Sequence, residues 1–380
     1  MRSQCFAYFY TSQGFTMDIL QKALESKESS HNLSPQELSK LYEYDIFTLG
    51  KAANELRTKR YGKKVFFNNN RHINPSNICA DVCKFCAFSA SRKNPNPYAM
   101  SIDEILTQAH KAYENGAKEL HIVSAHNPNY TYEWYFELFR EIKKALPQVH
   151  LKALTAAEVD YIDRISHKGY QKVLEDMVES GVDSMPGGGA EIFDESVRSY
   201  ICKGKVSSKR WLEIHAYWHS LGKMSNATML FGHIEKREHR IDHMLRLREI
   251  QSEDSKVASK NGGFNAFIPL LYQKENNFLN IKDFPSGQEI LKTIAIARIL
   301  LHNIPHIKAY WATLGLNMAI VAQEFGADDM DGTIQLESIQ SAAGAKSKSG
   351  LSKDELISQI KDAGFVAIER DSIYNELAEH

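Results

Sequence analysis

Three cysteines lie within eight positions of this chain, and their spacing is the sequence feature that most directly indicates chemistry. Cys79, Cys83 and Cys86 form the pattern Cys-x3-Cys-x2-Cys. A [4Fe–4S] cluster is normally held by four cysteine thiolates. Three ligands from one short segment leave one iron open to a reacting molecule. The spacing therefore predicts a [4Fe–4S] cluster that binds a further ligand.

The same thiols could instead form a zinc site or a disulfide. A structural zinc site usually has four ligands, and no second Cys-x2-Cys or His pair lies near the motif, although His72 could supply a fourth ligand. A disulfide would leave one thiol unpaired in a reducing compartment. A non-catalytic iron–sulfur or zinc protein that binds a partner is therefore the alternative of a different class. Cys5 and Cys202 have no partner in the sequence and are expected to be free thiols.

The composition indicates a globular protein with almost no net charge. The chain has 380 residues, of which 43% are hydrophobic and 24% charged, so it can fill a large core and is not disordered. Its formal net charge is -1, which gives no general attraction to nucleic acid or an anionic membrane. No apolar run approaches the roughly 20 residues of a membrane span. We expect a cytoplasmic protein with neither a nucleic-acid nor a membrane partner.

From residue 65 onward, short β-rich runs alternate with amphipathic helical runs. The capping box that Ser101 and Glu104 form begins one such helix, and Gly116 ends it. Such alternation requires parallel strands, and eight units suit a (β/α)8 TIM-like barrel. A doubly wound open sheet is the alternative. The predicted strands span residues 71–73, 119–123, 150–153, 183–185, 224–230, 264–270, 307–314 and 327–331.

Helical segments flank the predicted barrel on both sides. A capping box at Ser34 and Glu37 begins one leader helix, and Asp45 caps a second. We therefore expect an N-terminal extension and helical leader over residues 1–64, the barrel over 65–335, and a C-terminal loop with a short helical extension over 336–380. The first sixteen residues lack the apolar run of a secretory signal, and Met17 is the expected start.

The cysteine motif at the end of the first predicted barrel strand, with Phe85 before the last cysteine, resembles the radical S-adenosylmethionine (SAM) superfamily. The resemblance implies a radical SAM (β/α)8 barrel that holds a [4Fe–4S] cluster and uses SAM as a co-substrate. In that superfamily the open iron chelates the methionine amino and carboxylate groups. One electron then cleaves SAM to methionine and a 5′-deoxyadenosyl radical. Phe85 is expected to belong to the cofactor-binding residues.

Further SAM-binding residues follow from the same resemblance. The turn with Gly232 and Glu235, in the run MLFGHIE, matches the family's turn beneath the adenine. Ser124 stands where the family usually has a Gly-Gly turn that receives the SAM amino group, which is a departure. Glu158 and Glu191 are placed to bind the ribose hydroxyls. Either glutamate has a simpler interpretation as a helix-start carboxylate that the helix dipole favours.

Longer segments narrow the resemblance to the aminofutalosine synthases of menaquinone biosynthesis. The segments extend from RHINPSN at residue 71 through PGGGAEIF, NATMLFGHIE and FNAFIPL to HIKAYWATLG and FGADDMDGT, which ends at residue 333. Close relatives are the dehypoxanthine futalosine cyclases and the deazaflavin FO synthases. The last segment favours the aminofutalosine synthases.

This resemblance implies a substrate and an electron source. The expected substrate is 3-[(1-carboxyvinyl)oxy]benzoate, a small molecule with two carboxylates. The adenosyl radical adds to its vinyl carbon, and rearrangement with loss of carbon dioxide gives 6-amino-6-deoxyfutalosine. The electron is expected from a low-potential donor such as flavodoxin or ferredoxin.

Polar and aromatic residues at the predicted strand ends are the candidates for contacting this substrate, because barrel active sites lie at the carboxyl ends of the strands. Packing explains a lone histidine or aromatic residue there about as well. Arg298 lies in a predicted helix, where a salt bridge is expected instead. We expect catalytic roles for His72, His126, His233, Tyr310 and Asp329. Substrate contacts are expected from Asn74, Lys308, Trp311 and Asp331.

Overall fold

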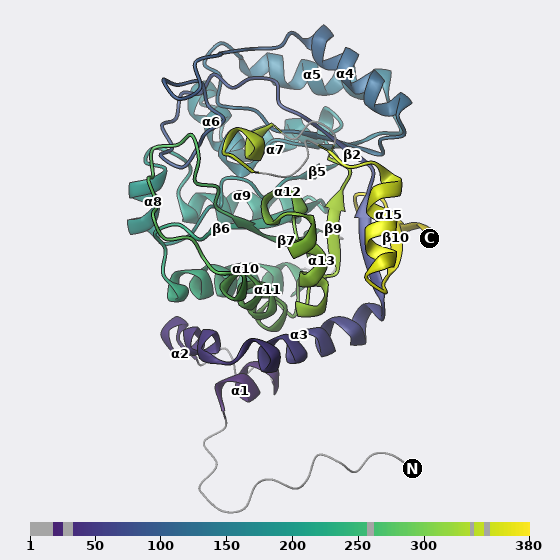
Figure 1. Ribbon diagram of the computed structural model, residues 1–380. Helices are drawn as coiled ribbons and strands as arrows, with labels where there is room; N and C mark the ends of the chain where they lie inside the picture. The colour runs from purple at the N-terminus through teal and green to yellow at the C-terminus, as the bar shows by residue number, and fades with distance from the viewer. Residues whose placement is uncertain (1–17, 26–32, 257–261, 335–337, 346–349) are drawn as a thin grey trace, which may run out of the picture.

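The computed structural model describes residues 18–25, 33–256, 262–334, 338–345 and 350–380. Met17, the expected start, and Cys5 lie outside these ranges. Within them, strands and helices alternate along the chain and form an α/β fold (Figure 1). No helix of this part of the chain is long and apolar enough to cross a membrane.

Seven parallel strands of the described chain form the central sheet, in the order β2-β3-β4-β5-β6-β7-β8. Because spatial order follows chain order, each strand returns to the start of the next by a crossover, which places helices on the outer face. The strands are β2 (Asn70–Ile73), β3 (Glu119–Ile122), β4 (His150–Ala153), β5 (Ser184–Met185), β6 (Met224–Phe231), β7 (Gly263–Leu271) and β8 (His306–Ile307).

Two further strands bring the ends of this curved sheet together. A parallel bridge joins Lys308, after β8, to Asp329 at the start of β9 (Asp329–Gly332). β9 pairs with β1 (Lys64–Asn68), which runs almost directly into β2. The N–H of Thr333 donates to the carbonyl of Asn68 at 3.1 Å. The curled parallel sheet of a TIM-like barrel is thus confirmed, and the open doubly wound sheet is not.

The helices that follow the strands form an outer layer (Figure 1), and most of them begin at a side-chain cap. Ser101 and Thr155 each form a capping box, which satisfies N–H groups left unpaired in the first helical turn. The outer helices are α4 (Ile102–Glu114), α5 (Tyr132–Ala145), α6 (Ala156–Ser166), α7 (Tyr170–Glu179), α8 (Glu195–Ile201), α9 (Ser208–Ser220), α10 (Arg237–Lys256) and α11 (Gly287–Leu300).

The leader helices pack below the barrel in Figure 1, where α3 runs beneath α11. The capping box at Ser34 and the cap at Asp45 are present as predicted. The N–H groups of Phe47 and Thr48 donate to Asp45. The leader comprises α1 (Ile19–Glu25), α2 (Pro35–Ser39), η2 (Lys40–Glu43) and α3 (Ile46–Tyr61).

The predicted strand over residues 307–314 is wrong in most of its length. After β8 the N–H groups of Lys308 and Ala309 donate to the carbonyls of Phe267 and Asp329, and the chain then turns at Tyr310. The aromatic and β-branched residues that indicated a strand lie buried in short helices instead, because burial rather than strand propensity selects them. These helices are α12 (Trp311–Leu314), α13 (Leu316–Val321) and η3 (Ala322–Phe325).

The C-terminal segment contains strands as well as the predicted helix. Ser352 caps α15 (Lys353–Asp362) with a capping box, after the short α14 (Ile339–Ala342). β10 (Val366–Arg370) then pairs in parallel with β1, and β11 (Glu376–Glu379) pairs antiparallel with β10. The strand that follows the leader helices and the C-terminal strands therefore share one small sheet, in the order β11-β10-β1-β9.

A buried ion pair fastens α11 to the segment that leads into β9. The guanidinium of Arg298 pairs with Asp328, and both side chains are fully buried. Arg298 also donates to the carbonyls of Gly326 at 2.7 Å and Pro305 at 2.8 Å. The other oxygen of Asp328 contacts His306. The expected salt bridge of Arg298 is confirmed.

Replacing Arg298 by Ala should lower the free energy of unfolding by about 3–5 kcal/mol, because it leaves the Asp328 carboxylate buried without its partner. Urea denaturation followed by circular dichroism measures this change. The exposed Lys59→Ala variant is the control and should change stability by less than about 0.5 kcal/mol. A similar small change for both variants would contradict the proposed role of the ion pair.

Candidate active site

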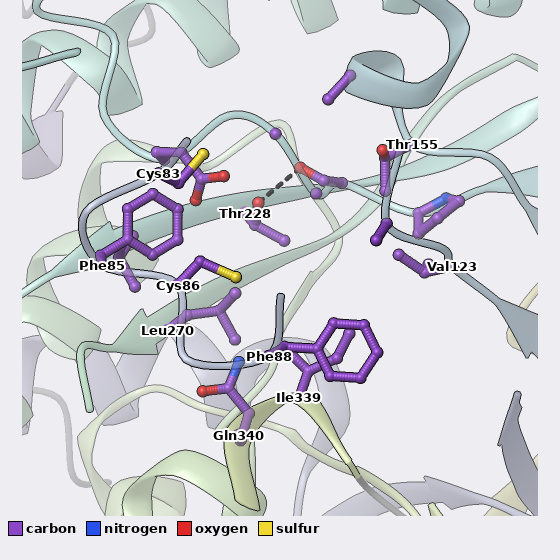
Figure 2. Close-up of a pocket in the computed structure, with 18 of the residues that line it drawn as sticks. Cys83, Phe85, Cys86, Phe88, Val123, Thr155, Thr228, Leu270, Ile339 and Gln340 are labelled. Atoms are coloured by element: carbon purple, nitrogen blue, oxygen red, sulfur yellow. Dashed lines mark hydrogen bonds between the residues drawn. The ribbon is translucent and has the colours of Figure 1, made fainter. Parts of the chain in front are cut away.

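A cavity of about 280 Å³ opens at the carboxyl-terminal ends of the barrel strands. Residues on or after each strand from β2 to β9 line it, because parallel strands end at one rim. Cys83, Phe85 and Cys86 lie on one side of the cavity in Figure 2, with Val123 and Thr155 opposite them. The strands therefore gather residues that are far apart in the sequence around one space.

The structure places most of the predicted site residues in the cavity wall, and the remainder elsewhere. The wall contains His72, Asn74, Cys79, Cys83, Phe85, Cys86, Ser124, His126, Glu191, Tyr310 and Asp331. The predicted residues that do not line the cavity are Glu158, Gly232, His233, Glu235, Lys308, Trp311 and Asp329.

The three cysteines of the motif all face this cavity from the loop after β2. They are partly exposed, and none forms a disulfide. Burial raises the pKa of Cys79 and, more strongly, that of Cys83, so these thiols hold their protons without a cationic ligand. The N–H of Ser89 donates to Cys86 Sγ at 3.4 Å. Coordination to a metal would remove those protons outright.

The donor set fits an iron–sulfur cluster better than a single metal ion. In the ranges that the structure describes, no three His, Cys, Asp or Glu side chains are gathered to hold one ion. Zinc needs thiolates about 2.3 Å from a single point, whereas each cysteine of an iron–sulfur cluster binds its own iron. Cys79, Cys83 and Cys86 are therefore the residues that would hold a cluster, and its fourth side would face the cavity.

His126 connects the cysteine loop to the loop after β3. Its Nδ1 lies 2.8 Å from Asp81 Oδ2, and its carbonyl accepts the N–H of Ala80 at 2.9 Å. Its ring stacks on Tyr161 with 4.7 Å between ring centres. Although burial works in the opposite direction, the contact with His126 lowers the pKa of Asp81. Through its contacts with Asp81 and Tyr161, His126 positions the cysteine loop and also lines the cavity.

The glycine-rich segment after β5 is shaped by close packing. A Cβ at Gly187 would lie 2.7 Å from the carbonyl of Asn226, and one at Gly188 would lie 2.7 Å from Thr155. These glycines therefore allow the segment to fit between β6 and the start of α6. Thr228 Oγ1 then donates to the carbonyl of Gly187 at 2.6 Å, one of the interactions in Figure 2.

Arg198 fixes the carbonyls of the same segment from behind. Its buried guanidinium donates to the carbonyl oxygens of Gly189, Ala190, Ile192 and Val206. One cation thus binds the backbone on both sides of residue 191. This hydrogen bonding positions the segment that carries Glu191.

Glu191 and Lys205 form a close charge pair in the cavity wall. Lys205 Nζ lies 2.6 Å from Glu191 Oε1, and Lys205 also lies 5.7 Å from the centre of the Phe85 ring. Glu191 has a φ of 45°, a conformation that non-glycine residues seldom adopt and that often occurs at functional sites. Together, the pair offers a hydrogen-bond acceptor and a cation to a polar ligand.

Glu158 occupies a structural position instead. Its two carboxylate oxygens accept the N–H of Ser124 at 2.8 Å and the N–H and hydroxyl of Thr155 at 2.8 Å. It is buried, and desolvation raises its pKa despite these hydrogen bonds. The interpretation as a helix-start carboxylate therefore describes its contacts, and Glu158 does not face the cavity as the ribose-binding prediction requires.

The turn after β6 is likewise closed on itself. Glu235 accepts the N–H of Gly232 at 2.7 Å and that of His233 at 2.8 Å, and pairs with Arg240 at 2.7 Å. A Cβ at Gly232 would lie 2.8 Å from Pro285, so packing fills the space above this glycine. The structure therefore places Gly232, His233 and Glu235 behind the wall, although the resemblance predicted contacts with adenine and a catalytic histidine.

Lys308, Trp311 and Asp329 lie in the barrel wall and are committed to other protein groups. Lys308 Nζ lies 3.1 Å from Asp331, Trp311 Nε1 donates to the carbonyl of Gly332 at 2.8 Å, and Asp329 pairs with Arg370 at 2.6 Å. All are buried. These three residues do not line the cavity, so their positions do not fit direct contact with a substrate. Asp331, in contrast, lines the cavity.

Two histidine rings meet on the wall formed by β2 and β3. The rings of His72 and His121 lie 4.5 Å apart because these residues are paired across the two strands. Burial holds the pKa of His121 well below its ordinary value, so its imidazole is neutral. Asp331 has a φ of 73° and completes a polar corner of the cavity. His121 was not among the predicted site residues.

The remaining predicted residues line the cavity with different partners. Asn74 donates to the carbonyl of Val123 at 2.9 Å, and the N–H of Ser124 is held by Glu158. Tyr310 lies at the start of α12. The sequence does not show that several other residues line the cavity, because their neighbours along the chain do not reveal where their side chains point. These residues are Asp81, His121, Thr155, Lys205, Asn226, Thr228 and Gln340. The cation–carboxylate pairing of Lys205 with Glu191 spans fourteen positions and forms only in the folded chain.

Comparisons with known proteins agree with this fold. A model described as the radical SAM superfamily matches residues 73–247, and one described as the CofH/MqnC C-terminal region matches residues 261–379. Among solved structures, methylornithine synthase superposes with a TM-score of 0.70 at 18% identity, covering 92% of this chain and 96% of that chain. The FeFe-hydrogenase maturase HydG from Carboxydothermus hydrogenoformans gives the same TM-score at 16% identity, covering 94% of this chain and 80% of that one.

Curated relatives match nearly the whole chain. The aminodeoxyfutalosine synthase of Thermus thermophilus is 40% identical over 94% of this chain and 95% of its own length. That of Streptomyces coelicolor is 38% identical over 95% of both chains. The cyclic dehypoxanthine futalosine synthase of Streptomyces coelicolor is 36% identical over 95% of this chain and 90% of its own length.

This chain therefore belongs to the radical SAM superfamily and, within it, to the family that includes the aminodeoxyfutalosine synthases. It is an enzyme that uses a [4Fe–4S] cluster and SAM, as members of this superfamily do. The alternative of a non-catalytic iron–sulfur or zinc protein does not hold.

Replacing Cys79, Cys83 or Cys86 by Ala should abolish the broad visible absorbance of the cluster and all SAM cleavage, because each cysteine supplies one of three ligands. Anaerobic reconstitution followed by absorbance and product analysis measures both. Cys202 is a buried free thiol outside the cavity wall, and Cys202→Ala is the matched control. Loss of the cluster in that control would contradict the three-ligand assignment.

Substitution of Glu191 and substitution of Glu158 should have different effects on SAM binding and on stability. Glu191→Gln should weaken SAM binding about tenfold or more, since a hydrogen bond to a charged group contributes about 1.5–3 kcal/mol, and should leave the cluster intact. Glu158→Gln should mainly lower the melting temperature, because its amide group would face the Thr155 donors. Equilibrium SAM binding and thermal unfolding distinguish the two. Normal SAM binding in Glu191→Gln would exclude the ribose contact.

Proposed function

We propose that this enzyme is an aminodeoxyfutalosine synthase of menaquinone biosynthesis. In this reaction the 5′-deoxyadenosyl group of SAM is joined to 3-[(1-carboxyvinyl)oxy]benzoate, and rearrangement with loss of carbon dioxide gives 6-amino-6-deoxyfutalosine. The cluster, when bound, supplies the electron that cleaves SAM. SAM is consumed, and methionine is a product.

The proposal depends on one observation, the near-complete match to two aminodeoxyfutalosine synthases at 40% and 38% identity. The segment FGADDMDGT at residues 325–333 supports the same family. The second candidate is cyclisation of dehypoxanthine futalosine, because a cyclic dehypoxanthine futalosine synthase is 36% identical over a similar length. An FO synthase-like activity is a more distant alternative. The difference in identity is small, so the product must separate these activities.

The residues that face the cavity fit a ligand with both apolar and anionic parts. Val123, Ile268 and Leu270 form an apolar surface that excludes water, which a reactive carbon radical requires. Lys205 and the histidines His72 and His126 supply donors for carboxylate oxygens. In this proposal Tyr310 and Asp331 border the substrate, while Glu191 binds SAM.

Lys308 has a supporting role in the proposed site, since it contacts Asp331 rather than the cavity. Its ammonium lowers the pKa of Asp331, although burial acts to raise it. Asp331 therefore remains a carboxylate that accepts hydrogen bonds. We propose that Lys308 and Asp331 orient neighbouring donors, and that neither forms an ion pair with a substrate carboxylate.

A low-potential donor such as flavodoxin or ferredoxin would provide the electron, and the reducing cytoplasm is the proposed location. The donor follows from the cluster, which needs an electron of low potential. The location follows from Cys79, Cys83 and Cys86, which must remain reduced to bind the cluster.

The fate of the adenosyl group tests this proposal. With 3-[(1-carboxyvinyl)oxy]benzoate and SAM labelled in its adenosine portion, the label should appear in a larger product that retains adenine, because the radical adds to the vinyl carbon. Anaerobic turnover followed by chromatography and mass spectrometry measures this product. Omission of the vinyl ether is the control and should yield only uncoupled 5′-deoxyadenosine.

The second candidate predicts the opposite result. A cyclase that abstracts hydrogen releases the label as 5′-deoxyadenosine while it converts dehypoxanthine futalosine. If that conversion occurs, and the vinyl ether gives no labelled adduct, the proposed function is wrong.

A further inference from the structure

The outer side of the cysteine loop is an exposed apolar surface. Val82, between two of the cluster cysteines, has 78% of its surface exposed, whereas Cys79 and Cys83 are partly buried. Tyr200, at the end of α8, is also half exposed and lies beside this loop. Large exposed side chains of this kind are often interaction sites when polar groups surround them. Here they lie on or beside the segment that carries the three cysteines.

Four basic residues, which we call the basic rim, lie near these apolar side chains, and one of them, Lys203, is exposed three positions after Tyr200. Contacts connect the other three: Lys84 Nζ lies 3.4 Å from the centre of the Tyr200 ring, and the carbonyl of Lys84 accepts the N–H of Phe278 at 2.7 Å. Two further cations lie over the ring of Phe278, at 5.2 Å and 4.9 Å from its centre. The basic rim consists of Lys84, Arg92, Lys93 and Lys203.

Two carboxylates beside the cysteine loop and α8 are engaged with protein groups, whereas Glu275, three positions before Phe278, is exposed. Asp81, in the same loop, is buried against His126, and Arg164 lies 3.7 Å from it. Glu195 accepts the N–H of Ser208 at 2.7 Å. Arg92, Lys93 and Lys203 are exposed. The whole chain has a formal charge of -1, so the positive charge beside the cluster is a local feature.

We propose that Val82, Tyr200 and the basic rim form the docking surface for a small acidic protein that carries one low-potential one-electron group. An apolar centre inside a polar rim is the usual anatomy of a protein interface, and complementary charge steers a transient partner into place. One electron leaves the reduced partner and enters the oxidised cluster, and no atoms are exchanged. The inference rests on the electron-donor part of the proposed function and not on the identity of the substrate.

Charge reversal at Arg92 and Lys203 tests this surface, because neither residue lines the cavity. Purified flavodoxin is the probe, and its dissociation constant is measured by titration calorimetry with the reconstituted enzyme. Arg92→Glu/Lys203→Glu should weaken binding about tenfold or more at low salt. At about 1 M salt, where the Debye length is about 3 Å, wild type and variant should bind similarly weakly.

The matched control is Lys59→Glu/Lys63→Glu, which makes the same change in charge on exposed residues at the opposite, amino-terminal end of the strands. This control should bind flavodoxin like the wild type. SAM cleavage is then compared with flavodoxin and with dithionite as reductant. Arg92→Glu/Lys203→Glu should lose rate with flavodoxin but keep the wild-type rate with dithionite, since the small reductant needs no docking surface.

Three results would overturn the inference: unchanged flavodoxin binding in Arg92→Glu/Lys203→Glu, an equal loss in the control, or an equal loss of rate with dithionite. The binding and SAM-cleavage measurements need no vinyl-ether substrate. Failure of the proposed substrate would therefore leave them intact, and the two failures are distinguishable.

Discussion

Parallel pairing of the barrel strands is the constraint on which the site depends. Since β2 to β8 run in one direction and follow one another around the sheet, their carboxyl ends lie on a single rim. Each loop can then contribute only a few residues, yet together they enclose one cavity. The cysteine loop could not share a cavity with Glu191 and Lys205 without this arrangement.

Hydrogen bonds and ion pairs join the loops of the rim to one another. Glu158, at the start of α6, holds the N–H of Ser124 after β3, and His126 holds Asp81 in the cysteine loop. Arg198 fixes the carbonyls that surround Glu191. A site that must keep a reactive radical away from other groups gains from such positioning.

Buried charge pairs make the barrel interior unusually polar. Glu119 and Lys152, on neighbouring strands, lie 2.7 Å apart and are almost fully buried. Burial by itself would raise the pKa of Glu119, but the Lys152 ammonium holds it well below its ordinary value. Such pairs contribute little net stability, because both charges lose their hydration, yet removal of one partner is costly. Asp329 of β9 and Arg370 of β10 form a second buried pair, which spans the strand β1 that lies between them.

The sequence by itself determined the features that depend on neighbouring residues. The cysteine spacing, the capping boxes at Ser34 and Ser101, and the alternation of strands and helices all follow from interactions over a few positions. Only the tertiary structure decided which polar side chains reach the cavity. Glu158 and Glu191 look alike in the sequence, but one closes a helix cap and the other faces the cavity beside Lys205. The reason is physical: burial, side-chain direction and ion pairing are fixed by segments that meet only when the barrel closes.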